Sequence, residues 1–83
     1  TGQDIQRSKP DPEIFLVAST RLQVPPNRCV VFEDAYSGVE AALSAGMGCV
    51  GVGDPERLGN APVVITSYDR QELPALLRSA FPA

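Results

Sequence analysis

The sequence predicts an α/β fold built on a parallel sheet. Segments with helical periodicity alternate with short apolar, β-branched runs that suit strands covered on both faces. This alternation implies parallel strands joined by right-handed crossovers. The 83 residues allow at most one small domain, and an apolar share of 43% is ordinary for a globular chain.

The first helix is predicted to start at Asp11-Pro12-Glu13. These residues provide an N-cap, a proline at the first helical position and an acid in the first turn. Apolar residues then recur at helical spacing as far as Leu22. Residues 25–27 (PPN) end this helix, and the run from Cys29 to Phe32 is predicted to be a buried strand.

A second helix is predicted almost directly after this strand. Ser37 and Glu40 have the spacing of a capping box, in which each side chain accepts a hydrogen bond from a backbone N–H of the first turn. Gly46 is placed to be the left-handed residue that ends the helix. Residues 48–52 (GCVGV) form the next predicted strand.

The remaining chain is predicted to contain one more strand and one more helix. Gly53-Asp54-Pro55 turns the chain, with Asp54 as a turn residue, and residues 55–58 are expected to form a single helical turn. Residues 63–65 (VVI) are the third predicted strand. The last helix is predicted over residues 72–80, with Pro74 within its first turn.

Composition excludes several classes of function. The net charge of −3 and pI near 4.7 argue against a nucleic-acid or anionic-membrane partner. We predict neither a membrane span nor a signal peptide. The chain has no histidine, which excludes Ser-His catalysis. Cys29 and Cys49 are interpreted as free buried thiols, which fits a cytoplasmic setting.

The candidate site combines two carboxylates with the only lysine of the chain. Glu33 and Asp34 follow an apolar run, and ligands of open parallel sheets bind beyond the carboxyl ends of strands. Adjacent carboxylates suit Mg²⁺, which prefers oxygen ligands. Lys9 precedes Pro10 and so projects from an extended segment, where it can neutralise a phosphoryl group. The plainer alternatives are a helix cap for the acids and a solvated surface position for Lys9.

Three segments resemble a known family. Residues 8–15 (SKPDPEIF) and 30–42 (VVFEDAYSGVEAA) resemble the third and fourth motifs of the haloacid dehalogenase superfamily. Residues 51–59 (GVGDPERLG) are similar to a loop of its β-phosphoglucomutase branch. The resemblance extends from Gly2 to about Leu77. It implies a Rossmann-like three-layer α/β/α core in which an aspartate nucleophile forms a phospho-aspartyl intermediate.

The same resemblance implies roles for three residues. Lys9 matches the lysine that neutralises charge between the nucleophile and the phosphoryl group, Asp34 matches a Mg²⁺ ligand, and Glu33 a second ligand as in the mutase branch. The family's nucleophile, its acid/base aspartate and its cap domain belong to earlier segments that these residues do not include. Residues 1–83 are therefore expected to be the C-terminal part of one core domain, inactive alone and partnered by a companion N-terminal fragment.

The resemblance leaves several functions open, of which a phosphonate-cleaving enzyme is the most distant. The leading one is a Mg²⁺-dependent mutase that interconverts β-glucose 1-phosphate and glucose 6-phosphate. The alternatives are a sugar-phosphate phosphatase of the same superfamily and, in another class, a non-catalytic fragment or binding module. The residues present do not separate mutase from phosphatase, because the cap and the acid/base residue decide whether sugar or water accepts the phosphoryl group.

Overall fold

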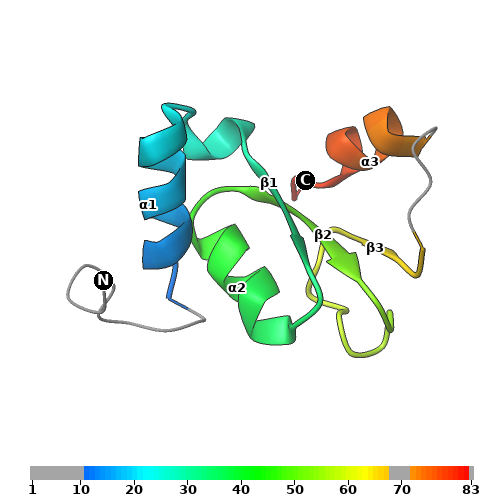
Figure 1. Ribbon diagram of the computed structural model, residues 1–83. Coiled ribbons are helices and arrows are strands. Elements are labelled where there is room, and N and C mark those ends of the chain that lie inside the picture. The colour runs from blue at the N-terminus through cyan, green and yellow to red at the C-terminus, as the bar shows by residue number, and fades with distance from the viewer. Residues whose placement is uncertain (1–10, 68–71, 83) are drawn as a thin grey trace.

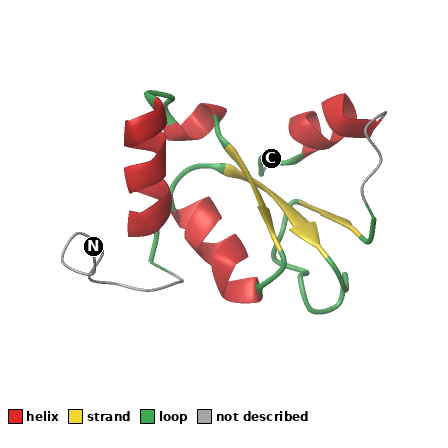
Figure 2. Ribbon diagram, in the orientation of Figure 1, coloured by secondary structure: helices red, strands yellow, loops and turns green. Residues whose placement is uncertain are grey.

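The computed structural model describes residues 11–67 and 72–82 and confirms the α/β class (Figures 1 and 2). Its three strands form one parallel sheet in the order β1-β2-β3. In chain order the elements are α1 (Glu13–Leu22), the 3-10 helix η1 (Pro26–Arg28), β1 (Val30–Glu33), α2 (Tyr36–Ser44), β2 (Gly48–Val52), β3 (Val63–Ile65) and α3 (Leu73–Ser79).

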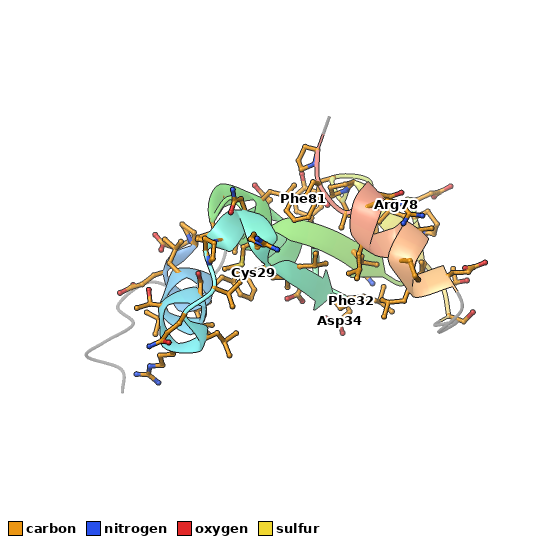
Figure 3. All side chains as sticks on the ribbon, turned by 90° about the horizontal axis from the view of Figure 1, so that it is seen from above. Cys29, Phe32, Asp34, Arg78 and Phe81 are labelled. Carbon is orange, nitrogen blue, oxygen red and sulfur yellow. The ribbon has the colours of Figure 1, made fainter. Side chains whose placement is uncertain are left out.

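Helices cover both faces of the sheet, with α1 and α2 on one side and α3 on the other (Figure 1). Alternation along the strands explains this arrangement. Cys49 of β2 lies beside Val31 of β1 and packs into a buried cluster with Val39 and Ala42 of α2. Gly48 faces the α3 side, where an added Cβ would lie 3.0 Å from the ring of Phe81. Figure 3 shows Phe81 lying against the sheet on that side.

The predicted start of α1 is nearly right. The helix begins at Glu13, one residue later than predicted, with Pro12 in helical conformation before it. The Glu13 N–H donates to Asp11 Oδ1 at 2.9 Å, so Asp11 still caps the first turn. The turn after this helix, placed at residues 25–27, is the 3-10 helix η1 at Pro26–Arg28.

The predicted capping box at the start of α2 is wrong. The N-cap is Ala35, which makes no side-chain cap hydrogen bond, and Ser37 is already the second residue of the helix. The reason is that only two residues separate β1 from α2, so the helix starts earlier than the serine. Gly46 follows the end of the helix with φ of 78°, as predicted.

The segment after β2 contains the predicted single helical turn. Residues 55–60 form successive turns, and the Leu58 N–H donates to the carbonyl of Asp54, four residues earlier, at 2.9 Å. Asp54 is a turn residue as predicted, because its Oδ1 accepts from the Glu56 N–H at 2.9 Å. Leu58 has no exposed surface and belongs to the same core cluster as Cys49.

β1 lies at the edge of the sheet in the part of the chain that the structure describes. It pairs with β2 on one side, and no described strand pairs with its other side. Phe32 on this strand is 42% exposed. Both cysteines are free thiols, Cys49 buried and Cys29 half-buried. Among residues 11–67 and 72–82 no helix has the length and apolarity that a bilayer crossing requires.

Candidate functional site at the carboxyl end of the sheet

Glu33 is the last residue of β1 and lies on the sheet face that α2 covers. In the parallel register it is paired with Gly51 of β2, so no side chain crowds it from that neighbour. Its Oε1 accepts hydrogen bonds from the N–H groups of Asp34 and Ala35, at 3.1 and 3.2 Å. The carboxylate therefore folds back over the start of α2, where the positive end of the helix dipole also favours it.

Gly38 makes room for this carboxylate. It is the third residue of α2, and a Cβ added there would lie less than 3.0 Å from three side-chain atoms of Glu33 (Cγ, Cδ and Oε2). Only a residue without a side chain leaves Glu33 its present position. The structure thus gives Glu33 a structural task at the start of α2, in line with the plainer alternative of a helix cap for the acids.

Asp34 follows β1 in an exposed bend. Figure 3 shows it just beyond the tip of the β1 arrow. The Arg57 guanidinium donates from Nη1 to the Asp34 backbone carbonyl at 2.7 Å. Glu33 and Asp34 thus differ: the first faces α2 and holds backbone amides, while the second extends toward solvent from a backbone held by an arginine.

A second contact joins the same two segments. Asn60 Nδ2 donates to the Tyr36 carbonyl at 3.2 Å, two residues beyond the Arg57 contact. Asn60 Oδ1 is a buried side-chain atom for which the described residues provide no hydrogen-bond partner. The loop after β2 therefore lies across the junction between β1 and α2.

The charge of Glu33 affects the ionisation of a cysteine in the core. Burial, and to a smaller extent the nearby Glu33 carboxylate, together raise the pKa of the Cys49 thiol to about 11. Both causes keep Cys49 in its neutral form at physiological pH, which suits a core position rather than a nucleophile.

Asp34, which is exposed beyond the strand end, suits Mg²⁺ as one carboxylate ligand, whereas the Glu33 carboxylate is turned toward α2. Mg²⁺ is commonly held by one or two carboxylates together with water and substrate phosphate oxygens. Among the described residues no group of three or more acidic, cysteine or histidine side chains gathers, so further ligands would have to come from elsewhere. Lys9, the third predicted site residue, lies outside the described residues, and its role stays a prediction.

The sequence analysis missed Arg57, Asn60 and Gly38. A usable signal was present for the first two, because the loops that follow β1 and β2 must meet at the same edge of a parallel sheet. The role of Gly38 had no such signal, since it depends on the side-chain conformation of Glu33.

The fold and the position of the acid pair define an α/β protein whose site lies beyond the carboxyl ends of parallel strands. Comparison with known proteins makes this specific. Residues 1–46 match the family model of haloacid dehalogenase-like hydrolases, more than half of the chain, and the chain belongs to this family. The predicted family resemblance is thereby confirmed.

Individual relatives include both a phosphatase and mutases. The validoxylamine A 7'-phosphate phosphatase of Streptomyces hygroscopicus subsp. limoneus is 44% identical over 68 residues, which cover 78% of this chain and 32% of that protein. The β-phosphoglucomutase of Bacillus subtilis is 44% identical over 61 residues, covering 74% and 27%. The crystal structure of β-phosphoglucomutase from Clostridium difficile superposes with a TM-score of 0.84 at 35% identity, covering 92% and 35%. The chain thus spans about a third of the length of these relatives.

Proposed function

We propose that this chain is the C-terminal part of a haloacid dehalogenase-type core domain and supplies its metal-binding acids and its lysine. The complete enzyme would transfer a phosphoryl group of a sugar phosphate by way of a phospho-aspartyl intermediate. The observation that carries this is the acid pair Glu33-Asp34 at the carboxyl end of an edge strand, within a chain of this family.

Each residue has a distinct task in this proposal. Asp34 is the principal ligand of Mg²⁺, because it is exposed beyond the strand end. Glu33 holds the backbone amides of Asp34 and Ala35 through Oε1 and so shapes the backbone that carries Asp34. Lys9 neutralises charge on the phosphoryl group. The metal, when bound, would screen the negative charge that develops during transfer.

The nucleophile would come from a segment outside these residues. We propose that its strand pairs with the free edge of β1, which the described residues leave without a neighbour on one side. The carboxylate of that strand would then lie next to Asp34, because the carboxyl ends of neighbouring parallel strands meet at one edge.

The leading activity is that of a β-phosphoglucomutase. Its support is the close superposition on the Clostridium difficile mutase, which covers 92% of this chain. A sugar-phosphate phosphatase is the second candidate, supported by the equal sequence identity to the Streptomyces phosphatase. A non-catalytic fragment or binding module is the alternative in which neither activity appears.

Phosphorus NMR of the complete protein tests the proposal. With β-glucose 1-phosphate and Mg²⁺, we expect glucose 6-phosphate from a mutase and free phosphate from a phosphatase. The 83-residue chain alone should produce neither. A complete protein that leaves this substrate and a panel of other sugar phosphates unchanged would overturn the proposed function in favour of a non-catalytic one.

Two substitutions test the residue assignments. Asp34→Ala and Lys9→Ala should each lower turnover by about 100-fold or more, since each removes charge stabilisation at the reacting group. Glu56→Gln is the matched control, because Glu56 is an exposed acid in the loop after β2. If Asp34→Ala leaves turnover unchanged at limiting Mg²⁺, Asp34 is not a metal ligand. If Lys9→Ala has only a mild effect on turnover, Lys9 is an ordinary solvated surface residue.

A further inference from the structure

The loop after β2 has a defined conformation that hydrogen bonds hold in place. Its turn is closed by the hydrogen bonds from Glu56 N–H to Asp54 Oδ1 and from Leu58 N–H to the Asp54 carbonyl, both 2.9 Å. The Ala61 N–H then donates to the Leu58 carbonyl at 3.0 Å. Leu58 is completely buried in the core cluster and so anchors the turn to the sheet.

The anchored loop places Arg57 over the end of β1. Gly53 has φ of 139°, and a Cβ added there would lie 3.1 Å from Nη2 of Arg57. Glycine at this position therefore both permits the backbone turn and leaves space for the guanidinium. The guanidinium Nη1 reaches the Asp34 carbonyl at 2.7 Å, a short distance for a charged N–H donor.

The Asp34 carbonyl lies just outside the hydrogen-bond pattern of α2. The first helical bond of α2 in this region runs from the Val39 N–H to the Ala35 carbonyl, at 3.0 Å. Arg57 therefore holds a peptide group that the helix itself does not hold. Asn60 adds a second restraint from the same loop, on the Tyr36 carbonyl.

We propose that Arg57 is a positioning residue that sets the direction of the Asp34 carboxylate by fixing the peptide group of Asp34. The side chain of an aspartate is short, so its direction follows the orientation of the backbone that carries it. Arg57 acts through the Asp34 backbone, to whose carbonyl it donates. The expected effect of Arg57 on Mg²⁺ binding rests on the proposed function, whereas its expected effect on the Asp34 backbone does not.

The test uses the complete protein with Arg57→Gln, Arg57→Lys and the control Arg78→Gln. Gln removes the charge, and Lys keeps the charge but loses the planar two-armed donor. Arg78 is an exposed arginine in the last turn of α3, on the other side of the sheet from α2 (Figure 3). Its loss removes a positive charge without touching the end of β1.

The first readout is amide hydrogen exchange without metal. Arg57→Gln should speed exchange of the Asp34 and Ala35 N–H groups by about three- to tenfold, because these amides keep their hydrogen bonds to Glu33 Oε1 but lose the restraint that the exposed Arg57 places on the Asp34 carbonyl. The Gly48 N–H, which donates to the Cys29 carbonyl at 2.9 Å, should be unchanged, as should all three amides in Arg78→Gln. Unchanged exchange at Asp34 and Ala35 would overturn the proposal.

The second readout is the Mg²⁺ concentration that gives half-maximal turnover. Arg57→Gln should raise it by about tenfold, as for other residues that orient a metal ligand, with a smaller effect on turnover at saturating Mg²⁺ and partial rescue by Arg57→Lys. Faster exchange with an unchanged Mg²⁺ requirement would make Arg57 merely structural and would overturn the proposal. An unsubstituted protein without Mg²⁺-dependent turnover would overturn the proposed function instead, and the exchange data would still decide whether Arg57 holds the Asp34 peptide.

Discussion

At the scale of single residues, Glu33 links the surface of the sheet to its core. One carboxylate oxygen accepts two backbone amides at the start of α2, and the charge also raises the pKa of the buried Cys49 thiol. Two consequences follow from one side chain. Its hydrogen bonds shape the candidate site, and its field opposes the ionisation of Cys49.

The Cys49 thiol should make stability depend on pH in the alkaline range. Its folded pKa of about 11 lies above the ordinary value of 9.0, so the unfolded chain loses this proton first. The contribution of the Cys49 thiol to the free energy of unfolding is therefore fully present below pH 9 and is lost as pH rises toward about 11. Urea unfolding from pH 7 to 11 should show a steeper decline for the unsubstituted chain than for Cys49→Ala.

Two further variants separate the causes of this pH dependence. Cys29→Ala is the matched control for the loss of a thiol, since Cys29 is only half-buried. Glu33→Gln removes the negative charge near Cys49 and so brings the pKa of the folded thiol closer to its ordinary value. The free energy of unfolding should then decline over a narrower pH range. If the free energy of unfolding falls equally steeply with pH in Cys49→Ala and in the unsubstituted chain, the assignment of this proton to Cys49 is contradicted.

At the scale of elements, α2 is capped from the preceding strand rather than from its own first turn. Glu33 in β1 accepts amides at the start of the helix, and Gly38 in the helix provides the space for that carboxylate. The strand end and the helix start thus form one unit.

This coupling can be measured with a double-mutant cycle of Glu33→Ala and Gly38→Ala. With Glu33 replaced, Gly38→Ala should raise the free energy of unfolding by about 0.5–1 kcal/mol, because alanine favours helix over glycine. With Glu33 present, this gain should be cancelled or reversed, because displacing the carboxylate loses capping bonds worth about 0.5–2 kcal/mol. Chemical denaturation of the four proteins gives the coupling energy.

Gly59→Ala is the control for this cycle. A Cβ at Gly59 would lie 3.6 Å from its nearest neighbour, the Pro55 carbonyl oxygen, in ordinary contact and away from Glu33. Its effect should be the same with and without Glu33. An additive cycle at Gly38 would show that Glu33 does not occupy this space in solution.

Sequence patterns predicted the elements well because the patterns are local. The strands at residues 48–52 and 63–65 have the predicted bounds, and β1 begins one residue later and ends one residue later than expected. The interactions at the candidate site depend instead on contacts between distant segments. The capping of α2 by Glu33 and the reach of Arg57 to Asp34 follow from side-chain conformations that no periodicity encodes. The roles of Lys9, Glu33 and Asp34 in catalysis stay predictions.

At the scale of the whole molecule, no strand among the described residues pairs with one side of β1, and this edge dominates the behaviour expected of the 83-residue chain by itself. Unpaired backbone groups at a strand edge are a template for pairing with another chain. Here Phe32, 42% exposed, lies on that strand. In the proposed enzyme this edge receives the strand that carries the nucleophile.

The 83-residue chain alone should therefore associate with itself as its concentration rises. Phe32→Lys should weaken this association by about tenfold, because it removes apolar area and places a charge at the edge. Sedimentation velocity over a range of concentrations measures the effect. Leu22→Lys is the control, since Leu22 is 69% exposed at the end of α1. A chain that stays monomeric at high concentration would contradict the need of β1 for a partner.

The loop contacts at the end of β1 also determine the order in which parts of the candidate site form during protein synthesis. Arg57 and Asn60 lie 23 and 24 positions after the residues that they hold. At about 5–20 residues per second, a ribosome adds these restraints about 1–5 s after it has made the acid pair. A nascent chain that ends before Arg57 carries both carboxylates but not the restraint on their backbone. The acids are thus made before the loop that restrains the Asp34 backbone.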